Sequence, residues 1–265
     1  MTYIAIYLVV GTVAGVMAGL LGIGGGLIIV PLLTVIFTSL GINHSVIVHL
    51  ALGTSLASIV FTSLSSVRSH FKRGSVNRSV VARITPGIIA GSYTGTWVAA
   101  MLSTNILKAF FGLFILYVAT QMLVGIKPKE GRTIPGTLGI FGSGCGIGLF
   151  SSLAGIGGGT LGVPFLVWCN IKIHEAIGTA AGIGFPIAIT GALGYIINGW
   201  GAADLPPHCL GYVYLPALIG IVSASILTAP LGVKLAHSLP VEKLRKIFAM
   251  LLYVVSAKML LSIVM

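Results

Sequence analysis

A ten-residue stretch that occurs twice divides the chain into two related halves. Residues 22–31 read G-I-G-G-G-L-I-I-V-P, and residues 155–164 read G-I-G-G-G-T-L-G-V-P. At a constant offset of 133 residues, seven of the ten positions are identical, which the apolar bias of a chain rarely produces by chance. The sequence therefore predicts a molecule built from two copies of one unit.

The scarcity of charge indicates that this unit lies in a lipid bilayer. Of 265 residues, 56% are hydrophobic and 7% are charged, and only four are acidic (Glu130, Glu175, Asp204 and Glu242). A soluble domain of this size carries a far larger share of charged residues on its surface. We interpret the net charge of +11 as Lys and Arg held in cytoplasmic loops, and we expect no nucleic-acid partner.

The apolar residues fall into ten segments that we expect to be helices. Most contain the roughly 20 residues that cross a bilayer as a helix, but the two segments after the repeated stretch are shorter and are predicted to be broken or re-entrant. The N-terminus lacks the features of a signal peptide, so the first segment is expected to remain as a span. The segments are 3–21, 27–41, 46–67, 79–101, 105–125, 134–154, 160–171, 176–198, 211–233 and 244–264.

Further matches extend the repeat over both halves. His49–Ser55 and His174–Ala180 share four residues at an offset of 125, and Gly74 matches Gly211 at an offset of 137. Each half then holds five segments, and this odd number puts the second copy into the membrane in the opposite orientation. The predicted fold is an all-α transmembrane protein made of two five-segment inverted-topology repeats. The first repeat spans 1–126, the second spans 134–265, and 127–133 form a cytoplasmic linker.

The distribution of basic residues agrees with this inversion. When the loop 68–83 is placed in the cytoplasm, counting the crossings puts 13 of the 15 Lys and Arg residues on that side. The corresponding loop of the second half, 199–207, contains Asp204 and no basic residue. Equivalent loops are therefore expected on opposite faces of the membrane.

The repeated glycines are predicted to form a site for an anion near the membrane midplane. Successive glycines sustain a helix poorly but permit positive φ and close approach of the backbone. A helix that begins just after them presents unpaired N–H groups and a partial positive charge, which bind an anion without a charged side chain. Such backbone is tolerated in a bilayer only where protein or a watery cavity covers it. The predicted substrate-binding glycines are Gly24, Gly25, Gly26, Gly157, Gly158 and Gly159.

The alternative for these glycines is close helix packing, which we favour for an isolated glycine such as Gly144. Hydroxyl residues after each motif are further candidate ligands. Thr54, Ser55 and Thr179 can either donate to an oxyanion or bond back to their own helix. His49 and His174 precede them, and are either capping or interfacial residues or groups whose protonation balances an anionic substrate. The three hydroxyl residues are candidates for substrate binding, and the two histidines are candidates for proton coupling.

Several kinds of chemistry have no counterpart in the sequence. By the segmentation above, all four acids fall in loops, so no carboxylate within the membrane is expected to bind Na⁺ or relay protons. The chain contains no G-x-x-x-x-G-K-[ST], H-E-x-x-H or G-x-S-x-G motif, and Cys145, Cys169 and Cys209 lack metal-ligand spacing. We therefore expect no cofactor, no metal and no enzymatic activity, and we disfavour cation transport.

The paired motifs resemble those of the TauE/SafE sulfite exporter family. The resemblance rests on G-I-G-G-G-x(4)-P in both halves, on the His-x-Ala-x-Gly-Thr pattern after each copy, on the basic loop and on the length. It covers essentially the whole chain and implies a multi-pass transporter of the bacterial inner membrane for sulfite, thiosulfate or an organosulfonate. Thr160 replaces Leu27 and Ala180 replaces Ser55 in the second copy, so Thr160 joins the candidate ligands and the pocket is expected to be asymmetric.

The leading functional hypothesis is a secondary transporter of small sulfur-containing anions that works by alternating access about the midplane site. An anion channel or a transporter of small carboxylates is the alternative, and an intramembrane enzyme is the least favoured. The direction of transport, the coupling ion, the particular anion and the oligomeric state stay open. The expected partners are a small anion and the lipid bilayer.

Overall fold

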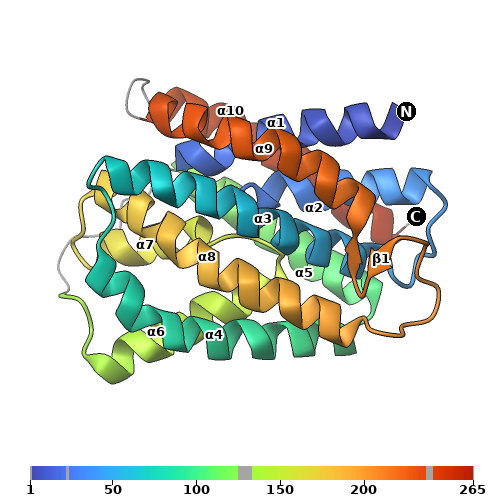
Figure 1. Ribbon diagram of the computed structural model, residues 1–265, viewed down its shortest axis with the longest axis horizontal. Helices are drawn as coiled ribbons and strands as arrows, with labels where there is room; N and C mark the ends of the chain where they lie inside the picture. Colours follow the sequence, from blue (N-terminus) through green and yellow to red (C-terminus); the bar gives the residue numbers. More distant parts are fainter. Residues whose placement is uncertain (1, 22–23, 125–132, 237–240, 265) are drawn as a thin grey trace.

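Ten helices make up nearly all of the described chain, as the ten apolar segments predict (Figure 1). The computed structural model describes residues 2–21, 24–124, 133–236 and 241–264. The helices are α1 Thr2–Leu21, α2 Gly26–Ser39, α3 Ile47–Lys72, α4 Arg78–Met101, α5 Thr104–Val124, α6 Thr137–Leu153, α7 Gly159–Trp168, α8 Ile173–Asn198, α9 Leu215–Ala236 and α10 Val241–Val264. The predicted linker, apart from residue 133, lies outside the described residues.

A short antiparallel hairpin before α9 was not predicted. Its strands are β1 (Cys209–Leu210) and β2 (Val213–Tyr214), and Gly211 in the turn has a φ of 54°. The ninth apolar segment was expected to begin at residue 211, whereas α9 begins at Leu215. The apolar character of the hairpin residues explains this error, because hydropathy alone does not separate a buried strand from the start of a helix.

The two helices that follow the glycine motifs are short, as predicted. α2 has 14 residues and α7 has 10, or about 21 and 15 Å, which is less than the roughly 30 Å of bilayer hydrocarbon. By contrast, α3, α5, α8 and α9 are long and apolar enough to cross a membrane. In Figure 1, α1 starts and α2 ends at the same end of the molecule. The chain therefore enters the bundle along α1 and returns to the same end along α2.

Two acids lie in helices, although all four were expected in loops. Glu175 is in the first turn of α8, and Glu242 is in the first turn of α10. For Glu175 this position is favourable, because a carboxylate in the first turn is stabilised by the partial positive charge of the helix N-terminus. Asp204 does lie in a loop, and Glu130 lies outside the described residues. The described acids thus stand at helix ends or in a loop.

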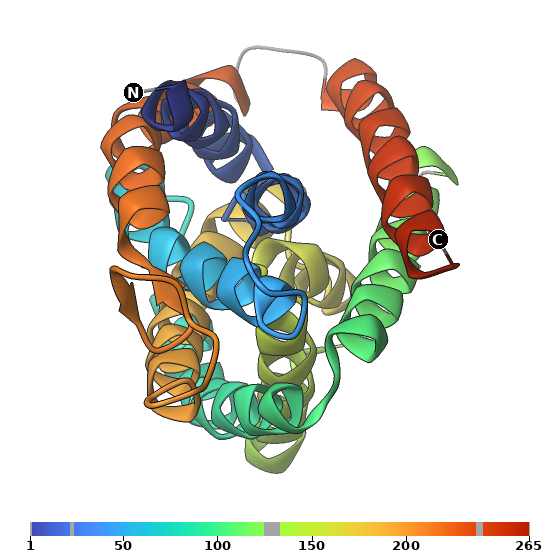
Figure 2. The ribbon, with the colours of Figure 1, turned by 90° about the vertical axis from the view of Figure 1, so that its right-hand side faces the viewer.

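Each major helix contact joins the first half of the chain to the second. α1 packs against α9, α4 against α6, α3 against α8, and α5 against α10. Viewed along the bundle in Figure 2, α2 lies in the middle, with α3 and α7 beside it. The two halves therefore interlock and share one hydrophobic core.

Glycine seams allow two of these helix pairs to approach closely. A Cβ on Gly15 of α1 would lie 2.6 Å from the Ser225 carbonyl oxygen of α9, and one on Gly95 of α4 would lie 2.6 Å from the Leu149 carbonyl oxygen of α6. Gly144 of α6 likewise faces the Ile84 carbonyl of α4 at 2.6 Å. The packing role expected for Gly144 is confirmed, because no larger residue fits between these backbones.

We predict that Gly15→Ala lowers stability by about 1 to 3 kcal/mol, because its methyl group has to displace the α9 backbone. The matched control is Gly146→Ala in α6, where an added Cβ has no neighbour within 4 Å among the described residues. The Gly146→Ala substitution should leave stability unchanged or raise it by up to about 1 kcal/mol, since alanine favours a helix more than glycine does. Thermal unfolding in detergent compares the two variants, and equal losses would contradict the role of the seam.

Candidate functional site

The two glycine motifs meet inside the bundle, although 133 residues separate them. A Cβ on Gly24 would lie 3.2 Å from the Gly157 Cα, and one on Gly26 would lie 2.8 Å from the Ile156 Cα. All six predicted site glycines are buried. The motif positions 22 and 23 lie outside the described residues. The structure thus brings both predicted half-sites to one place, which we call the glycine junction (residues 24–26 and 155–160).

The two copies turn differently at the junction. Gly24 and Gly25 have φ values of 76° and 85°, where L side chains are strained. In the second copy the positive φ of 61° belongs to Gly155, whereas Gly158 has a φ of −65°. The repeat predicted a positive φ at Gly158, as at Gly25. This prediction is wrong.

Gly155 has a positive φ because it terminates α6. The Gly155 N–H donates to the Ser152 carbonyl at 3.2 Å, and the Ile156 N–H donates to the Ser151 carbonyl at 3.0 Å. This pair of bonds is the Schellman arrangement, in which a left-handed glycine satisfies the last carbonyls of a helix. The break in the second half is therefore a helix stop followed two residues later by the Gly157–Gly159 run.

Both short helices begin at the junction, and the first N–H groups of a helix have no partner within the helix itself. α2 starts at Gly26 and α7 starts at Gly159, each two residues beyond the contact between Gly24 and Gly157. The N–H groups of Gly159 and Thr160 have no hydrogen-bond acceptor among the described residues. Two helix N-termini, each carrying about half a positive charge, therefore lie close together.

Thr160 adds a side-chain donor at this point. Its side chain is 5% exposed, and its hydroxyl has no hydrogen-bond partner within the described part of the chain. A buried hydroxyl without a partner costs about 1 to 3 kcal/mol, so it is expected to serve a ligand or a water. Among the predicted side-chain ligands, Thr160 is the one whose environment most favours that role.

Thr54 and Thr179 instead bind backbone of the opposite half. The Tyr214 N–H donates to the Thr54 hydroxyl at 2.9 Å, and the Asn77 N–H donates to the Thr179 hydroxyl at 2.9 Å. Neither hydroxyl bonds back to its own helix, which was one of the two expected arrangements. Ser55 donates to the Gly155 carbonyl at 2.8 Å and so ties α3 to the junction.

A narrow cavity lies beside Gly24 and is lined by Ser63 and Ser66 of α3 and by Gly184 of α8. Its volume of ≈ 10 Å³ is about enough for one water. The Ser66 hydroxyl is buried without a partner among the described residues, and sequence reasoning missed it. The spacing in the sequence could have indicated it, because hydroxyl residues recur along one face of α3. These residues, all buried, are Ser55, Ser58, Thr62 and Ser66.

The two candidate histidines have different environments. His49 is buried, its Nε2 lies 3.1 Å from the Ala99 carbonyl oxygen, and its ring lies 5.0 Å from the ring of Tyr212. The His49 Nδ1 has no partner within the described residues. His174, in contrast, is exposed at the start of α8. The match between them in sequence therefore does not extend to their surroundings.

A buried cation near the start of α5 was also missed. Lys108 is 5% exposed, and its Nζ lies 3.0 Å from Nε2 of His44 in the connection between α2 and α3. No carboxylate pairs with it in the part of the chain that the structure describes. A buried ammonium group that no carboxylate pairs attracts anions. Sequence reasoning did not propose Lys108 as a candidate ligand.

Comparison with known proteins identifies relatives over almost the whole chain. The family model described as Sulfite exporter TauE/SafE matches residues 7–259. A probable membrane transporter protein of Haemophilus influenzae is 40% identical over 262 residues, covering 98% of this chain and 99% of that protein. One of Methanocaldococcus jannaschii is 30% identical over 273 residues, covering 96% and 94%.

A probable membrane transporter protein of Bacillus subtilis is 28% identical over 214 residues, covering 73% of this chain and 78% of its own length. No solved structure matches the chain. The matches agree with an all-helical protein that has several apolar helices and passes through the membrane more than once. The chain belongs to the TauE/SafE sulfite exporter family.

Proposed function

We propose that the protein is a secondary transporter that carries a small sulfur-containing anion, such as sulfite, thiosulfate or an organosulfonate, across the plasma membrane by alternating access. The observation that carries the proposal is the glycine junction. There α2 and α7 begin, and the Thr160 hydroxyl, which has no hydrogen-bond partner among the described residues, lies in the first turn of α7. The junction offers N–H and O–H donors, which suit an oxyanion better than a cation or an amine.

The two halves are proposed to be inverted repeats, and reciprocal hydrogen bonds support this. Thr179 lies 125 residues after Thr54, and Tyr214 lies 137 residues after Asn77, which are the offsets that the sequence repeat gives. Each threonine accepts the N–H of the opposite half. Exchanging the halves therefore reproduces both bonds, as well as the pairing of α1 with α9 and of α6 with α4.

The orientation is proposed from the positions of the connections. In Figure 1 the connections after α3 and after α7 lie at one end of the molecule, and those after α2 and after α8 lie at the other. The first end carries Arg73 and Lys172, and the second carries Asp204. The positive-inside rule then places the first end in the cytoplasm. The basic residues of 127–132 lie outside the described residues.

We predict that a cysteine at position 203 reacts with an impermeant thiol reagent added from outside intact cells, and that a cysteine at position 73 does not. Both Ala203 and Arg73 are exposed. The variants Ala203→Cys and Arg73→Cys are made after the three native cysteines have been replaced by alanine. Labelling in permeabilised cells controls for reactivity. The reverse pattern would overturn the proposed orientation.

An anion at the junction would exchange its hydration for fixed neutral donors. In a site closed to water these donors stabilise charge more than they do in solution, while they bind less tightly than a lysine or an arginine and so permit release. Lys108, close to the start of α5, would raise the local concentration of anions at the outer end. The binding site and the attracting cation are thus proposed to be separate.

The structure is closed around the junction, because the adjacent cavity has room for about one water. Alternating access then requires one group of helices to move relative to another. The helices α5 and α10 pack mainly on each other and have fewer contacts with the remaining bundle. We propose that this pair moves against the rest and opens the junction.

We predict that Thr160→Val weakens binding of the transported anion by about 1 to 3 kcal/mol, because a donor to a charged ligand is lost while the shape is kept. The control is Thr34→Val in α2, whose hydroxyl donates to the Val30 carbonyl at 2.8 Å. Calorimetric titration of the purified protein with sulfite, thiosulfate, sulfoacetate and lactate measures affinity and tests the carboxylate alternative. Equal affinities in wild type and Thr160→Val would remove this residue from the site.

We predict that His49→Gln flattens the pH dependence of transport, and that His174→Gln preserves it. The reason is that His49 is buried with an unpartnered ring nitrogen within the described residues, whereas His174 is exposed. Uptake by proteoliposomes at several values between about pH 5 and pH 8 measures the effect. A wild-type profile in His49→Gln would exclude proton coupling through this residue.

A further inference from the structure

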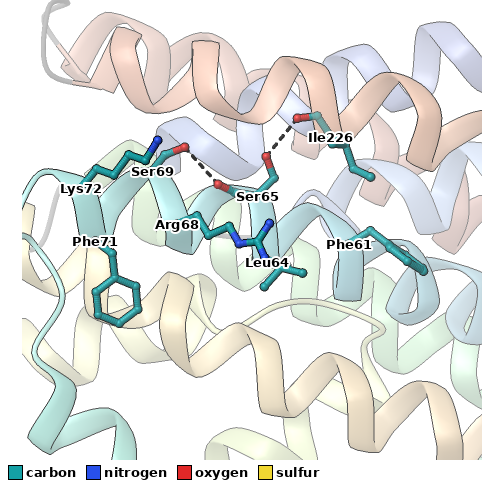
Figure 3. A pocket seen from close by; sticks show the side chains of 8 residues that line it. All are labelled: Phe61, Leu64, Ser65, Arg68, Ser69, Phe71, Lys72 and Ile226. Carbon is teal, nitrogen blue, oxygen red and sulfur yellow. Dashed lines mark hydrogen bonds between the residues drawn. The ribbon is translucent and has the colours of Figure 1, made fainter.

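A groove lies on the side of the bundle, separate from the glycine junction. Its lining changes from apolar to cationic along its length. It has a volume of ≈ 600 Å³ and follows the second half of α3, while Ile226 of α9 contributes to one wall (Figure 3). The Ser65 hydroxyl donates to the Ile226 carbonyl at 3.0 Å and holds that wall against α3. Along α3 the lining runs from Phe61 and Leu64 to Arg68, Phe71 and Lys72, and the Arg68 guanidinium lies beside Leu64 in Figure 3.

The two cations at the groove are one turn apart and exposed. Arg68 and Lys72 extend from the same stretch of α3 in Figure 3. Neither has an ion-pair partner among the residues that the structure describes. A third cation, Arg78, lies over the ring of Phe71 at 4.9 Å and adds to the positive potential nearby. Among the described residues, no acid lines this end of the groove.

The length of α3 puts the change from apolar to cationic lining at a membrane surface. α3 has 26 residues and is about 39 Å long, so it exceeds the roughly 30 Å of hydrocarbon and its last turn reaches the headgroup region. Phe61 lies 11 residues before Lys72, or about 16 Å deeper. A phospholipid has the same sequence of parts, with a charged phosphate at the surface and acyl chains below.

The second half of the chain provides an internal comparison. At the offset of 125 that relates α3 to α8, Arg68 corresponds to Leu193 and Lys72 corresponds to Ile197. Leu193 and Ile197 are 53% and 60% exposed, so the equivalent face of α8 is apolar at these positions. The repeated fold therefore does not require the cations. They occur only at the end of the bundle that the proposed orientation places in the cytoplasm, where membrane leaflets carry anionic lipids.

We propose that this groove binds an anionic phospholipid of the cytoplasmic leaflet. Arg68 and Lys72 pair with the headgroup phosphate, since a guanidinium can hold it through two hydrogen bonds and an ammonium adds a point charge. One acyl chain lies along Phe61, Leu64 and Ile226. The bound lipid bridges α3 and α9 and thereby joins the two halves of the chain at this surface.

Native mass spectrometry of the delipidated full-length protein in neutral detergent tests the proposal, with phosphatidylglycerol and phosphatidylcholine as probes. Wild type should bind phosphatidylglycerol more tightly. The double variant Arg68→Gln/Lys72→Gln should bind it roughly 25-fold more weakly, since each cation contributes a factor of about five near an anionic lipid. The control Arg83→Gln/Lys172→Gln removes two exposed cations at the same end and should bind as wild type does.

Three results would overturn the proposal. They are equal binding of the two lipids by wild type, wild-type binding of phosphatidylglycerol by the double variant, and displacement of the lipid by an equal concentration of sulfite or inorganic phosphate. The last result would assign the groove to a free anion. If the double variant does not fold, Leu64→Trp obstructs the apolar end and keeps both charges. It should also reduce binding of phosphatidylglycerol.

Discussion

Unpaired backbone at the start of two helices is the constraint on which this architecture depends. In hydrocarbon an unsatisfied N–H group costs on the order of several kcal/mol, so a helix can begin inside a membrane only where protein or a ligand covers its first turn. α2 and α7 both begin in this way, and they do so beside each other. α3 and α8 provide the cover, with Ile59 against Gly24 and the Ala180 carbonyl 2.7 Å from the position of a Cβ on Gly158.

This cover requires the two halves of the chain to interlock. Glycines in α1 and α4 bring those helices onto α9 and α6, and the hydroxyls of Thr54 and Thr179 receive N–H groups from the opposite half. The junction consequently lies at the interface of the halves, where a relative movement of helices changes its access. The same small residues therefore satisfy a packing requirement and create the place where the proposed substrate binds. The packing and binding interpretations of the glycines are compatible.

Hydropathy and repetition predicted the helices, the short α2 and α7, and the motifs that meet at the junction, because these features depend on local composition and internal symmetry. The sequence did not predict the termination of α6 at Gly155, the hairpin before α9 or the acids in first helical turns, which depend on hydrogen bonds at helix ends. The hydrogen-bond partners of Thr54, Thr179 and Lys108 were not predicted either. Each such contact joins residues 64 to 160 positions apart, and local pattern carries no information on it.

The most direct test of the account is a structure determined with selenite, an anionic analogue of sulfite whose selenium scatters anomalously. The account predicts an anomalous peak at the glycine junction, within about 3 to 4 Å of the backbone nitrogens at Gly26 and Gly159 and of the Thr160 hydroxyl. A peak confined to the Lys108 and His44 pair or to the groove at Arg68, with none at the junction under saturating selenite, would contradict it. The glycines would then serve helix packing alone.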